Sequence, residues 1–114
     1  MKNNWVDISE SNNHKAQDER LHDGISHYDA WDMDEYLLHI LSTGLKYLAN
    51  GISFPGNEKF PTPNSWKEAL LKYSHIFQEV LESDSYSDDE IKKRQALLEE
   101  GMNFLKDNFF DLWD

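Results

Sequence analysis

The stretch HDGISHYD contains the side chains of this sequence that are best suited to metal binding. His22, Asp23, His27 and Asp29 fall within eight residues, and imidazole and carboxylate groups are ligands of zinc and related ions. The stretch has no helical periodicity that would hold the four groups at fixed distances. We therefore expect neither a metal ion nor another cofactor. A small metal-binding or catalytic domain that uses His22, Asp23 and His27 is the third of three functional hypotheses.

Carboxylates form three further clusters, a pattern that general acid–base catalysis can use. They lie at residues 32–35, 88–90 and 99–100. The first two clusters coincide with predicted helix starts, where helix capping and the helix dipole account for acidic side chains. Acid–base catalysis also requires a second group with a shifted pKa in a cleft, and no sequence pattern indicates one. The sequence has no phosphate-binding glycine loop and no Glu-x-x-His pattern, so we expect that the protein is not an enzyme.

The net charge limits the partners that the protein can have. Its 114 residues include 22 acidic and 11 basic side chains, and the net charge is −11. We therefore expect no direct binding to nucleic acid through a basic surface and no attraction to anionic membranes. A protein with a basic surface would instead be attracted at long range. The alternative is that the acidic charge only keeps the protein soluble.

Three features bear on the cellular location. Cysteine is absent, which excludes disulfides and thiolate metal sites and agrees with a reducing cytoplasm. The first residues, MKNNWVDISESNN, lack the apolar segment of a signal peptide. No apolar run approaches the roughly 20 residues that span a membrane, so we expect a soluble intracellular protein.

Amphipathic periodicity predicts helices, and no segment alternates with the period of a strand. The first helix is expected over residues 33–49, between Asp32 as N-cap and the stop signal Asn50–Gly51. The second is expected to begin at Ser65, where SWKE forms a capping box. The pair Thr62–Pro63 offers a rival start one turn earlier.

A third helix is expected over residues 88–112, after Ser87 as N-cap. Its apolar residues recur at steps of seven, four, three, four and three, as in a coiled-coil seam. These residues are Ile91, Leu98, Met102, Leu105, Phe109 and Leu112. Phe110 and Trp113 widen the seam, so we expect the end of the sequence to form a last helical turn packed on the core.

The three helices predict an all-α fold, a small antiparallel three-helix bundle over residues 29–114. We expect Trp31, Trp66 and Trp113 to lie in its core, and Phe54 and Phe60 to pack beneath the proline-rich loop. Two isolated glycines within helices, Gly44 and Gly101, indicate close helix packing.

Residues 1–28 are predicted to form a flexible or loosely docked N-terminal arm. The segment SESNNHKAQDER is polar and has no sustained period, and such composition disfavours a packed core. We expect the apolar residues Trp5, Val6 and Ile8 either to pack as a short extended anchor at the start of this arm or to engage a partner.

Three stretches share a pattern beyond their helical periodicity: WDMDEYLLHILSTGLKYLANG, PTPNSWKEALLKYSHIFQEVLES and LLEEGMNFLKDNFFDLWD. The pattern is a Trp-Asp-hydrophobic-Asp helix start, a proline-rich loop, a Trp-led second helix and a close in Leu-Trp-Asp. It resembles a widespread family of small bacteriophage and prophage proteins without established function. The matching residues are Trp31, Asp32, Asp34, Trp66, Phe77, Leu112, Trp113 and Asp114. The resemblance implies a phage gene product that acts in the host bacterial cytoplasm, and it supplies no catalytic residues.

The leading functional hypothesis is an acidic phage protein that inhibits a host defence nuclease, as anti-CRISPR proteins do. Its carboxylates would replace phosphates against the lysines and arginines of a nucleic-acid-binding groove, so its partner would be a basic host protein such as the nuclease or its guide complex. The residues expected to bind that partner are Asp88, Asp89, Glu99, Glu100 and Asp107. The alternative is a non-catalytic interaction module in phage assembly or replication, with a homodimer as one form.

Overall fold

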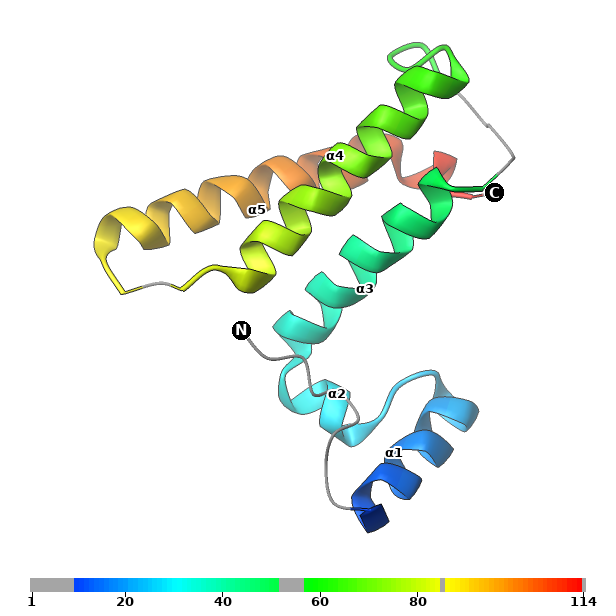
Figure 1. The fold of residues 1–114 in the computed structure, drawn as a ribbon, viewed down its shortest axis with the longest axis vertical. Helices are drawn as coiled ribbons and strands as arrows, with labels where there is room; N and C mark the ends of the chain where they lie inside the picture. Colours follow the sequence, from blue (N-terminus) through cyan, green and yellow to red (C-terminus); the bar gives the residue numbers. More distant parts are fainter. Residues whose placement is uncertain (1–9, 52–56, 85, 114) are drawn as a thin grey trace. The chain divides into compact units, whose positions relative to one another are not determined.

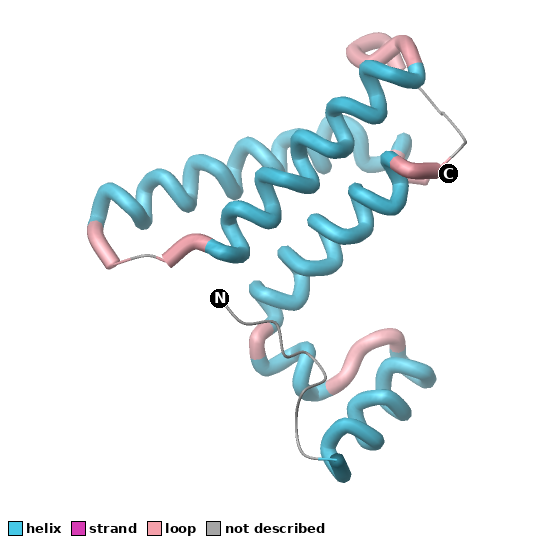
Figure 2. Tube along the Cα trace, in the orientation of Figure 1, coloured by secondary structure: helices cyan, strands magenta, loops and turns pink. Residues whose placement is uncertain are grey.

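The computed structural model of the protein describes residues 10–51, 57–84 and 86–113. All regular structure in this part of the chain is helical, which confirms the expected all-α class (Figures 1 and 2). The helices are α1 (Glu10–Asp23), α2 (His27–Trp31), α3 (Met33–Ala49), α4 (Pro63–Glu82) and α5 (Asp88–Asn108), followed by the 3-10 turn η1 (Phe109–Asp111).

The chain divides into two compact units, Met1–Leu37 and Leu38–Asp114. The first unit contains α1, α2 and the beginning of α3, and the second contains the rest of α3 with α4, α5 and η1. Helix α1 lies within the segment that we expected to be an irregular arm. The anchor residues Trp5, Val6 and Ile8 lie outside the described residues.

Helix α3 occupies the residues predicted for the first helix, 33–49. Asp32 ends α2, and its carbonyl accepts a hydrogen bond from the backbone N–H of Tyr36 at 2.9 Å. At the other end the backbone N–H of Gly51 donates to the carbonyl of Leu48 at 3.1 Å. The short link through Asp32 therefore lets α3 start directly after α2.

Helix α4 begins one turn before the expected Ser65, at the rival start. Thr62 is the N-cap, and its hydroxyl accepts a hydrogen bond from the backbone N–H of Ser65 at 3.1 Å. The Ser65 hydroxyl in turn accepts from the backbone N–H of Thr62, which completes a capping box. Pro63 fits the first helical position because its ring holds φ near the helical value and no N–H is lost there.

Helix α5 begins as predicted, because the Ser87 side chain accepts a hydrogen bond from the backbone N–H of Glu90 at 3.2 Å. Its end differs from the prediction. The α-helix stops at Asn108, and the chain tightens into η1 instead of continuing to residue 112.

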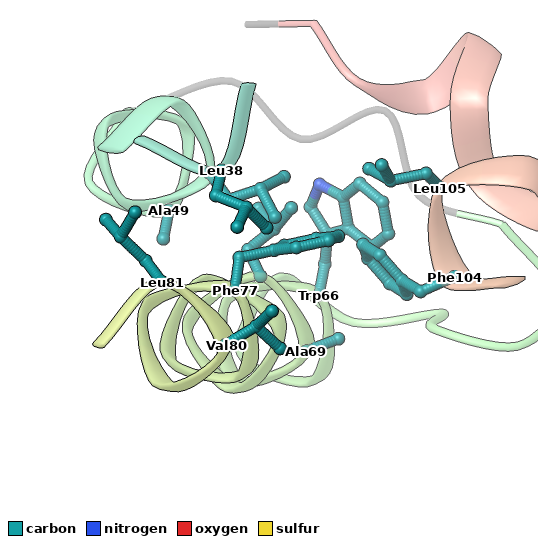
Figure 3. Packing of buried hydrophobic residues seen from close by; sticks show 11 residues of the cluster. Leu38, Ala49, Trp66, Ala69, Phe77, Val80, Leu81, Phe104 and Leu105 are labelled. Atoms are coloured by element: carbon teal, nitrogen blue, oxygen red, sulfur yellow. The ribbon is translucent and has the colours of Figure 1, made fainter. Parts of the chain in front are cut away.

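One buried cluster forms the core of the second unit (Figure 3). The chain turns back after α3 and again after α4 (Figure 1), so all three helices supply residues to it. The cluster consists of Leu38, Leu45, Ala49, Trp66, Ala69, Leu70, Phe77, Val80, Leu81, Phe104 and Leu105. Burial of each large apolar side chain contributes about 1.5–3 kcal/mol, so this cluster is the main source of the unit's stability.

Aromatic rings fill the part of the core nearest the proline-rich loop. Tyr73 and Phe104 stack with their ring centroids 4.0 Å apart, and Phe60 and Trp66 lie 5.7 Å apart. The predictions that Trp66 is buried and that Phe60 packs on the core are confirmed. Phe54 lies outside the described residues.

The buried face of α5 differs from the predicted seam. Gly101, Phe104, Leu105 and Asn108 are its buried residues, and Leu97, Leu98 and Leu112 pack at the edge of the cluster. Ile91, Met102 and Phe109 are exposed instead. Three residues of the predicted seam, Leu98, Leu105 and Leu112, do pack on the core. The heptad pattern was wrong for the others because a glycine and an asparagine, which are not apolar, occupy two of the four buried positions.

The aromatic residues at the end of the sequence are also more exposed than expected. Phe110 is 88% exposed, and Phe109 and Trp113 are more than half exposed, while Leu112 packs against the core. Trp31 is likewise 74% exposed and not part of the core. At 3.6 residues per turn Phe110 lies about 170° from the centre of the buried face of α5, so it would be exposed even if the α-helix continued.

Candidate functional site

The five carboxylates predicted to bind a partner lie on one side of α5. Asp88, Asp89, Glu99, Glu100 and Asp107 are all exposed. At 3.6 residues per turn their positions fall within a sector of about 120°, and they extend over about 29 Å of helix. We call this set the acidic face. The structure therefore brings together, on one helix surface, residues that are up to 19 positions apart in the sequence.

The acidic face also carries some positive charge. By the same helical geometry Lys92 and Lys106 fall within the sector of the five carboxylates. Glu100 is 3.8 Å from the ammonium group of Lys72 on α4, and both side chains are substantially exposed. Exposed ion pairs of this kind are weak, about 0–1 kcal/mol, so Glu100 can exchange Lys72 for a basic group on a partner.

A second surface feature is an apolar hollow between α3 and the last part of the described chain. Ile40, Leu41, Gly44 and Leu48 line it from α3, with Leu45 and Tyr47. Leu105 and Leu112 line it from the other side. Its volume is about 440 Å³, which lies in the range of ligand-binding clefts.

Gly44 was expected to mark close helix packing, and this expectation is wrong. A Cβ atom at Gly44 would meet no atom within 4 Å. Its neighbour on the same face, Ile40, is 47% exposed. The α3 helix therefore has one wide apolar stripe, of which one part packs in the core and the other part is open to solvent.

A third surface feature is a hollow between α3 and α4, where most of the lining residues have polar side chains. Ser42, Lys46, Asn50, Ser74 and His75 are among the residues that line it. The buried hydroxyl of Ser74 donates a hydrogen bond to the carbonyl of Ser42. This contact is satisfied within the protein, so the floor of the hollow has a structural role in joining the two helices.

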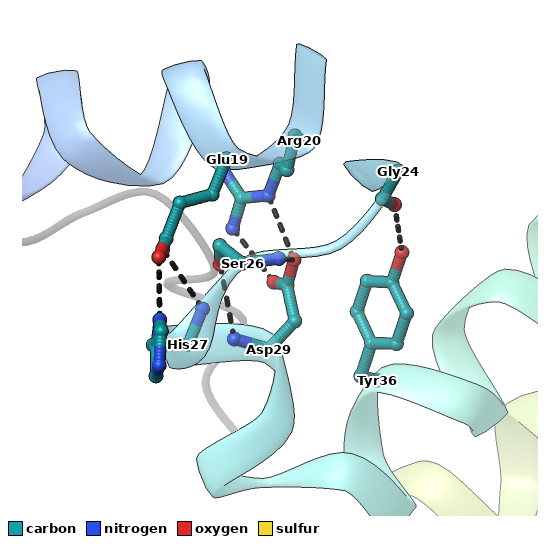
Figure 4. A network of polar contacts seen from close by, with 7 residues as sticks. All are labelled: Glu19, Arg20, Gly24, Ser26, His27, Asp29 and Tyr36. Carbon is teal, nitrogen blue, oxygen red and sulfur yellow. Dashed lines mark hydrogen bonds and ion pairs between the residues drawn. The ribbon is translucent and has the colours of Figure 1, made fainter. Parts of the chain in front are cut away.

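In the first unit, a buried ion pair connects α1 to α2 (Figure 4). The Arg20 Nε and Nη2 atoms donate to the two carboxylate oxygens of Asp29 at 2.9 and 2.7 Å. Asp29 is fully buried, and it also accepts a hydrogen bond from the backbone N–H of Ser26 at 2.9 Å. Such a bidentate arrangement is among the stronger charged contacts in proteins.

Opposing effects act on the pKa of Asp29. Burial raises this pKa, but the hydrogen bonds from Arg20 and Ser26 outweigh burial and hold the pKa below its ordinary value. A second contact parallels the first: His27 donates its backbone N–H to Glu19 at 3.0 Å, and its ring Nδ1 pairs with the same carboxylate. The backbone hydrogen bond and the ring contact lower the pKa of Glu19.

These contacts determine the roles of the HDGISHYD residues. Both oxygens of Asp29 are engaged by Arg20 and Ser26, and His27 is paired with Glu19. Within the residues that the structure describes, no group of three or more His, Asp or Glu side chains could hold a metal ion. The polar residues of this stretch instead join α1 to α2.

Sequence reasoning missed this network and the apolar hollow. Periodicity does not reveal the network, because its partners, Arg20 and Asp29, are nine residues apart and lie on different helices. The sequence did contain a signal for the start of α2, the capping box formed by Ser26 and Asp29. The exposure of Ile40 had no signal, since it belongs to the same apolar stripe as the buried Leu38 and Leu45.

Comparisons with known proteins provide no family assignment. No protein-family model matches the sequence, and neither the curated proteins nor the solved structures contain a significant match. Among the helices that the structure describes, none has the length and apolar character needed to cross a membrane.

Proposed function

We propose that the protein is an acidic, non-catalytic binding protein that occludes the basic nucleic-acid-binding groove of another protein. The observation that carries this proposal is the acidic face, with its five exposed carboxylates on a single helix. Carboxylates accept charge-assisted hydrogen bonds from lysine and arginine, as phosphates do. The net charge of −11 adds long-range attraction to a basic groove.

The proposed partner is a host defence nuclease, such as a CRISPR effector or its guide complex, in the bacterial cytoplasm. This choice rests on the resemblance of the sequence to small phage proteins, which places the chain in conflict with host defence. In this proposal α3, α4 and α5 act as an antiparallel three-helix bundle that holds the acidic face rigid, and the residues before 29 act as a loosely docked arm.

The proposal is tested with two triple variants that change the net charge equally. The first, Glu99→Gln, Glu100→Gln and Asp107→Asn, neutralises the acidic face without altering the first turn of α5. The second, Glu58→Gln, Glu68→Gln and Asp84→Asn, neutralises three exposed carboxylates elsewhere in the second unit. DNA cleavage by a purified CRISPR nuclease and its guide is measured with each variant and with the wild-type protein.

We expect the first triple variant to lose inhibition by about tenfold or more and the second to change it by less than about twofold, because close charge pairs contribute more than distant charges. Inhibition by the wild-type protein should also weaken as ionic strength increases. Equal effects of the two triple variants would show that the acidic face has no special role. Absence of inhibition across CRISPR nucleases would remove this class of target.

A second candidate function is favoured by the exposed aromatic residues Phe109, Phe110 and Trp113. An interaction module in phage assembly or replication could use them to form a homodimer. Sedimentation analysis tests this alternative, because aromatic association should persist at high salt, unlike binding through the acidic face. The alternative would be supported if the wild-type protein is a dimer and Phe110→Ser is a monomer. A wild-type protein that is a monomer at all salt concentrations would exclude the homodimer.

A further inference from the structure

The apolar hollow has the composition of a binding groove. Its walls are Ile40, Leu41, Gly44 and Leu48 on α3 and Leu105 and Leu112 opposite them. None of the described residues that line it is charged. Leu45 and Leu105 are nearly buried at its base, whereas Ile40 is about half exposed. The hollow is therefore an open extension of the hydrophobic core.

Gly44 is the feature that makes this hollow deep enough for an incoming side chain. Any other residue at this position would place a Cβ atom in the space that is now open. A glycine inside an exposed helix is destabilising relative to alanine. The α3 helix thus has a destabilising residue where it faces no neighbour, which is the arrangement expected when another molecule approaches the backbone closely.

The dimensions of the hollow match an α-helical occupant. The lining residues of α3 extend from Ile40 to Leu48, about 12 Å along the helix axis. Two turns of a docked helix cover about 11 Å and present apolar side chains at positions i, i+3 or i+4, and i+7. An apolar groove of this length fits three such anchors.

We propose that the apolar hollow receives one amphipathic helix of the partner, with apolar anchors on one side and basic residues on the other. This inference rests on the proposed function, and it deepens it by adding an apolar contact to the electrostatic one. The charge of the protein selects the occupant: a basic helix is attracted by the net charge of −11, whereas a second copy of this chain is repelled by it.

The two contacts have separate roles. The acidic face accelerates the encounter and is weakened by salt, because its charges are exposed. The apolar hollow buries the anchors, slows dissociation and is little affected by salt. Variants of the two surfaces therefore change different properties of one complex.

The test uses a synthetic helical peptide as the probe. It has about 18 residues, five turns of helix, and consists of leucine on one face and lysine on the other. A peptide of the same composition in scrambled order, without an apolar face, is the control. Binding is followed by NMR through the amide signal of Gly44 and the methyl signals of Ile40, in full-length protein.

Ile40→Asp and Ile91→Asp form a matched pair of variants. Both isoleucines lie on helices of the second unit, they are 47% and 49% exposed, and both changes add one negative charge. Gly44→Leu is a further variant that fills the hollow and favours the helix, so it tests the hollow even if Ile40→Asp does not fold. We expect Ile40→Asp and Gly44→Leu to weaken peptide binding by about tenfold or more, and Ile91→Asp to weaken it by less than about twofold.

Several outcomes would overturn this inference. They are equal losses in the two aspartate variants, equal binding of the scrambled peptide, and peptide-induced shifts that map to the acidic face and leave Gly44 unchanged. Shifts of Gly44 that depend on protein concentration without peptide would identify a second copy as the occupant instead. Failure of the proposed function is distinguishable from failure of this inference, because the nuclease assay with the acidic-face variants does not involve the peptide.

Discussion

The ring of Phe77 occupies the space that a side chain at position 101 would fill. A Cβ atom at Gly101 would lie 2.7 Å from Cζ and 2.8 Å from Cε1 of Phe77. Because Phe77 is completely buried, its ring has no open space into which it could move. The close contact between α4 and α5 therefore depends on the glycine, and the expectation that Gly101 marks close helix packing is confirmed.

We expect Gly101→Ala to lower the free energy of unfolding by about 1–2 kcal/mol. Overpacking in a core costs about 1–3 kcal/mol, and the gain in helix propensity, at most about 1 kcal/mol, offsets only part of it. Gly44→Ala is the matched control, because its Cβ meets no atom, and it should stabilise the protein by about 0.5–1 kcal/mol. Urea denaturation of both variants measures the difference, and a stabilising effect of Gly101→Ala would contradict the packing described.

The side chain of Asn57, in the loop between α3 and α4, forms hydrogen bonds with residues at the end of α5 and in η1. Its side-chain amide donates to Asn108 Oδ1 at 2.8 Å and to Asp111 Oδ2 at 2.9 Å, while its own oxygen accepts from the backbone N–H of Phe60. We expect Asn57→Ala to destabilise the protein by about 1–3 kcal/mol, because Asn108 is buried and loses its donor.

Asn57→Asp should be more harmful than Asn57→Ala at neutral pH, since it places a second carboxylate beside Asp111. The difference between the two variants should narrow at acidic pH, where protonation of the introduced carboxyl group removes the repulsion between like charges. Denaturation curves at both pH values test this. Equal stability of the two variants at neutral pH would show that the contact with Asp111 does not persist in solution.

The Arg20–Asp29 pair predicts how the first unit responds to acid. Because the folded-state pKa of Asp29 is below its ordinary value, the stability it provides is complete above that value. This stability is lost as the pH falls through the lowered, folded-state pKa. Asp29→Asn removes the negative charge that pairs with the partly exposed guanidinium of Arg20, and we expect it to cost about 1.5–3 kcal/mol at neutral pH.

The stability difference between the wild-type protein and Asp29→Asn should therefore shrink as the pH falls below the ordinary aspartate pKa, about 3.9, and through the lowered folded-state pKa of Asp29. Amide hydrogen exchange of residues in α1 and α2 measures this local stability at each pH. Asp34→Asn, at an exposed position of the same unit, is the control and should have little effect. A constant difference across this pH range would mean that Asp29 titrates with an unperturbed pKa.

The start of α4 provides a direct comparison between two hydroxyl residues. Thr62→Ala removes the N-cap acceptor for the backbone N–H of Ser65 and should cost about 1 kcal/mol. Ser65→Ala removes the exposed hydrogen bonds between the Ser65 hydroxyl and Thr62. It keeps the N-cap acceptor and should therefore cost less. Thermal unfolding of both variants, with Asn64→Ala as the control, measures the order. The reverse order would place the N-cap at Ser65.

Helix boundaries were the part of the fold that sequence reasoning predicted best. The limits of α3 and the start of α5 follow from local chemistry: an apolar stripe between stop signals, and a serine that caps the first turn. The sequence also contains capping signals for two possible starts of α4, at Thr62 and at Ser65. The choice between them depends on how well Pro63 fits the first helical position, which a single capping-box pattern does not weigh.

The orientation of the helices was predicted less well, because it depends on partners distant in sequence. Gly101 faces the core only because Phe77 fills the space above it, and Asn108 is buried only because Asn57 binds it. Neither residue looks apolar in the sequence, so Met102 and Phe109 were assigned to the core instead. Helix α1 was missed for the same reason: polar pairs with α2, not an apolar stripe, are its main contacts.

For the candidate site, the exposure of the five acidic residues of α5 followed from their charge and spacing. The exposure of the apolar hollow could not be predicted in this way, because Ile40 and Leu41 belong to the same hydrophobic pattern as the buried Leu38 and Leu45. Amphipathic periodicity identifies an apolar stripe but not how much of its width a neighbouring helix covers.

The two units differ in their intrinsic optical probes. Trp66 is buried between Phe60 and Phe104, while Trp31 is exposed and contacts Tyr28 with ring centroids 4.8 Å apart. Near-ultraviolet circular dichroism arises from aromatic rings held in a fixed asymmetric environment, so Trp66 of the second unit should dominate that signal. Far-ultraviolet circular dichroism instead follows the helices of both units. Heating the protein while recording both signals would therefore show whether the two units melt as one cooperative system or in separate steps.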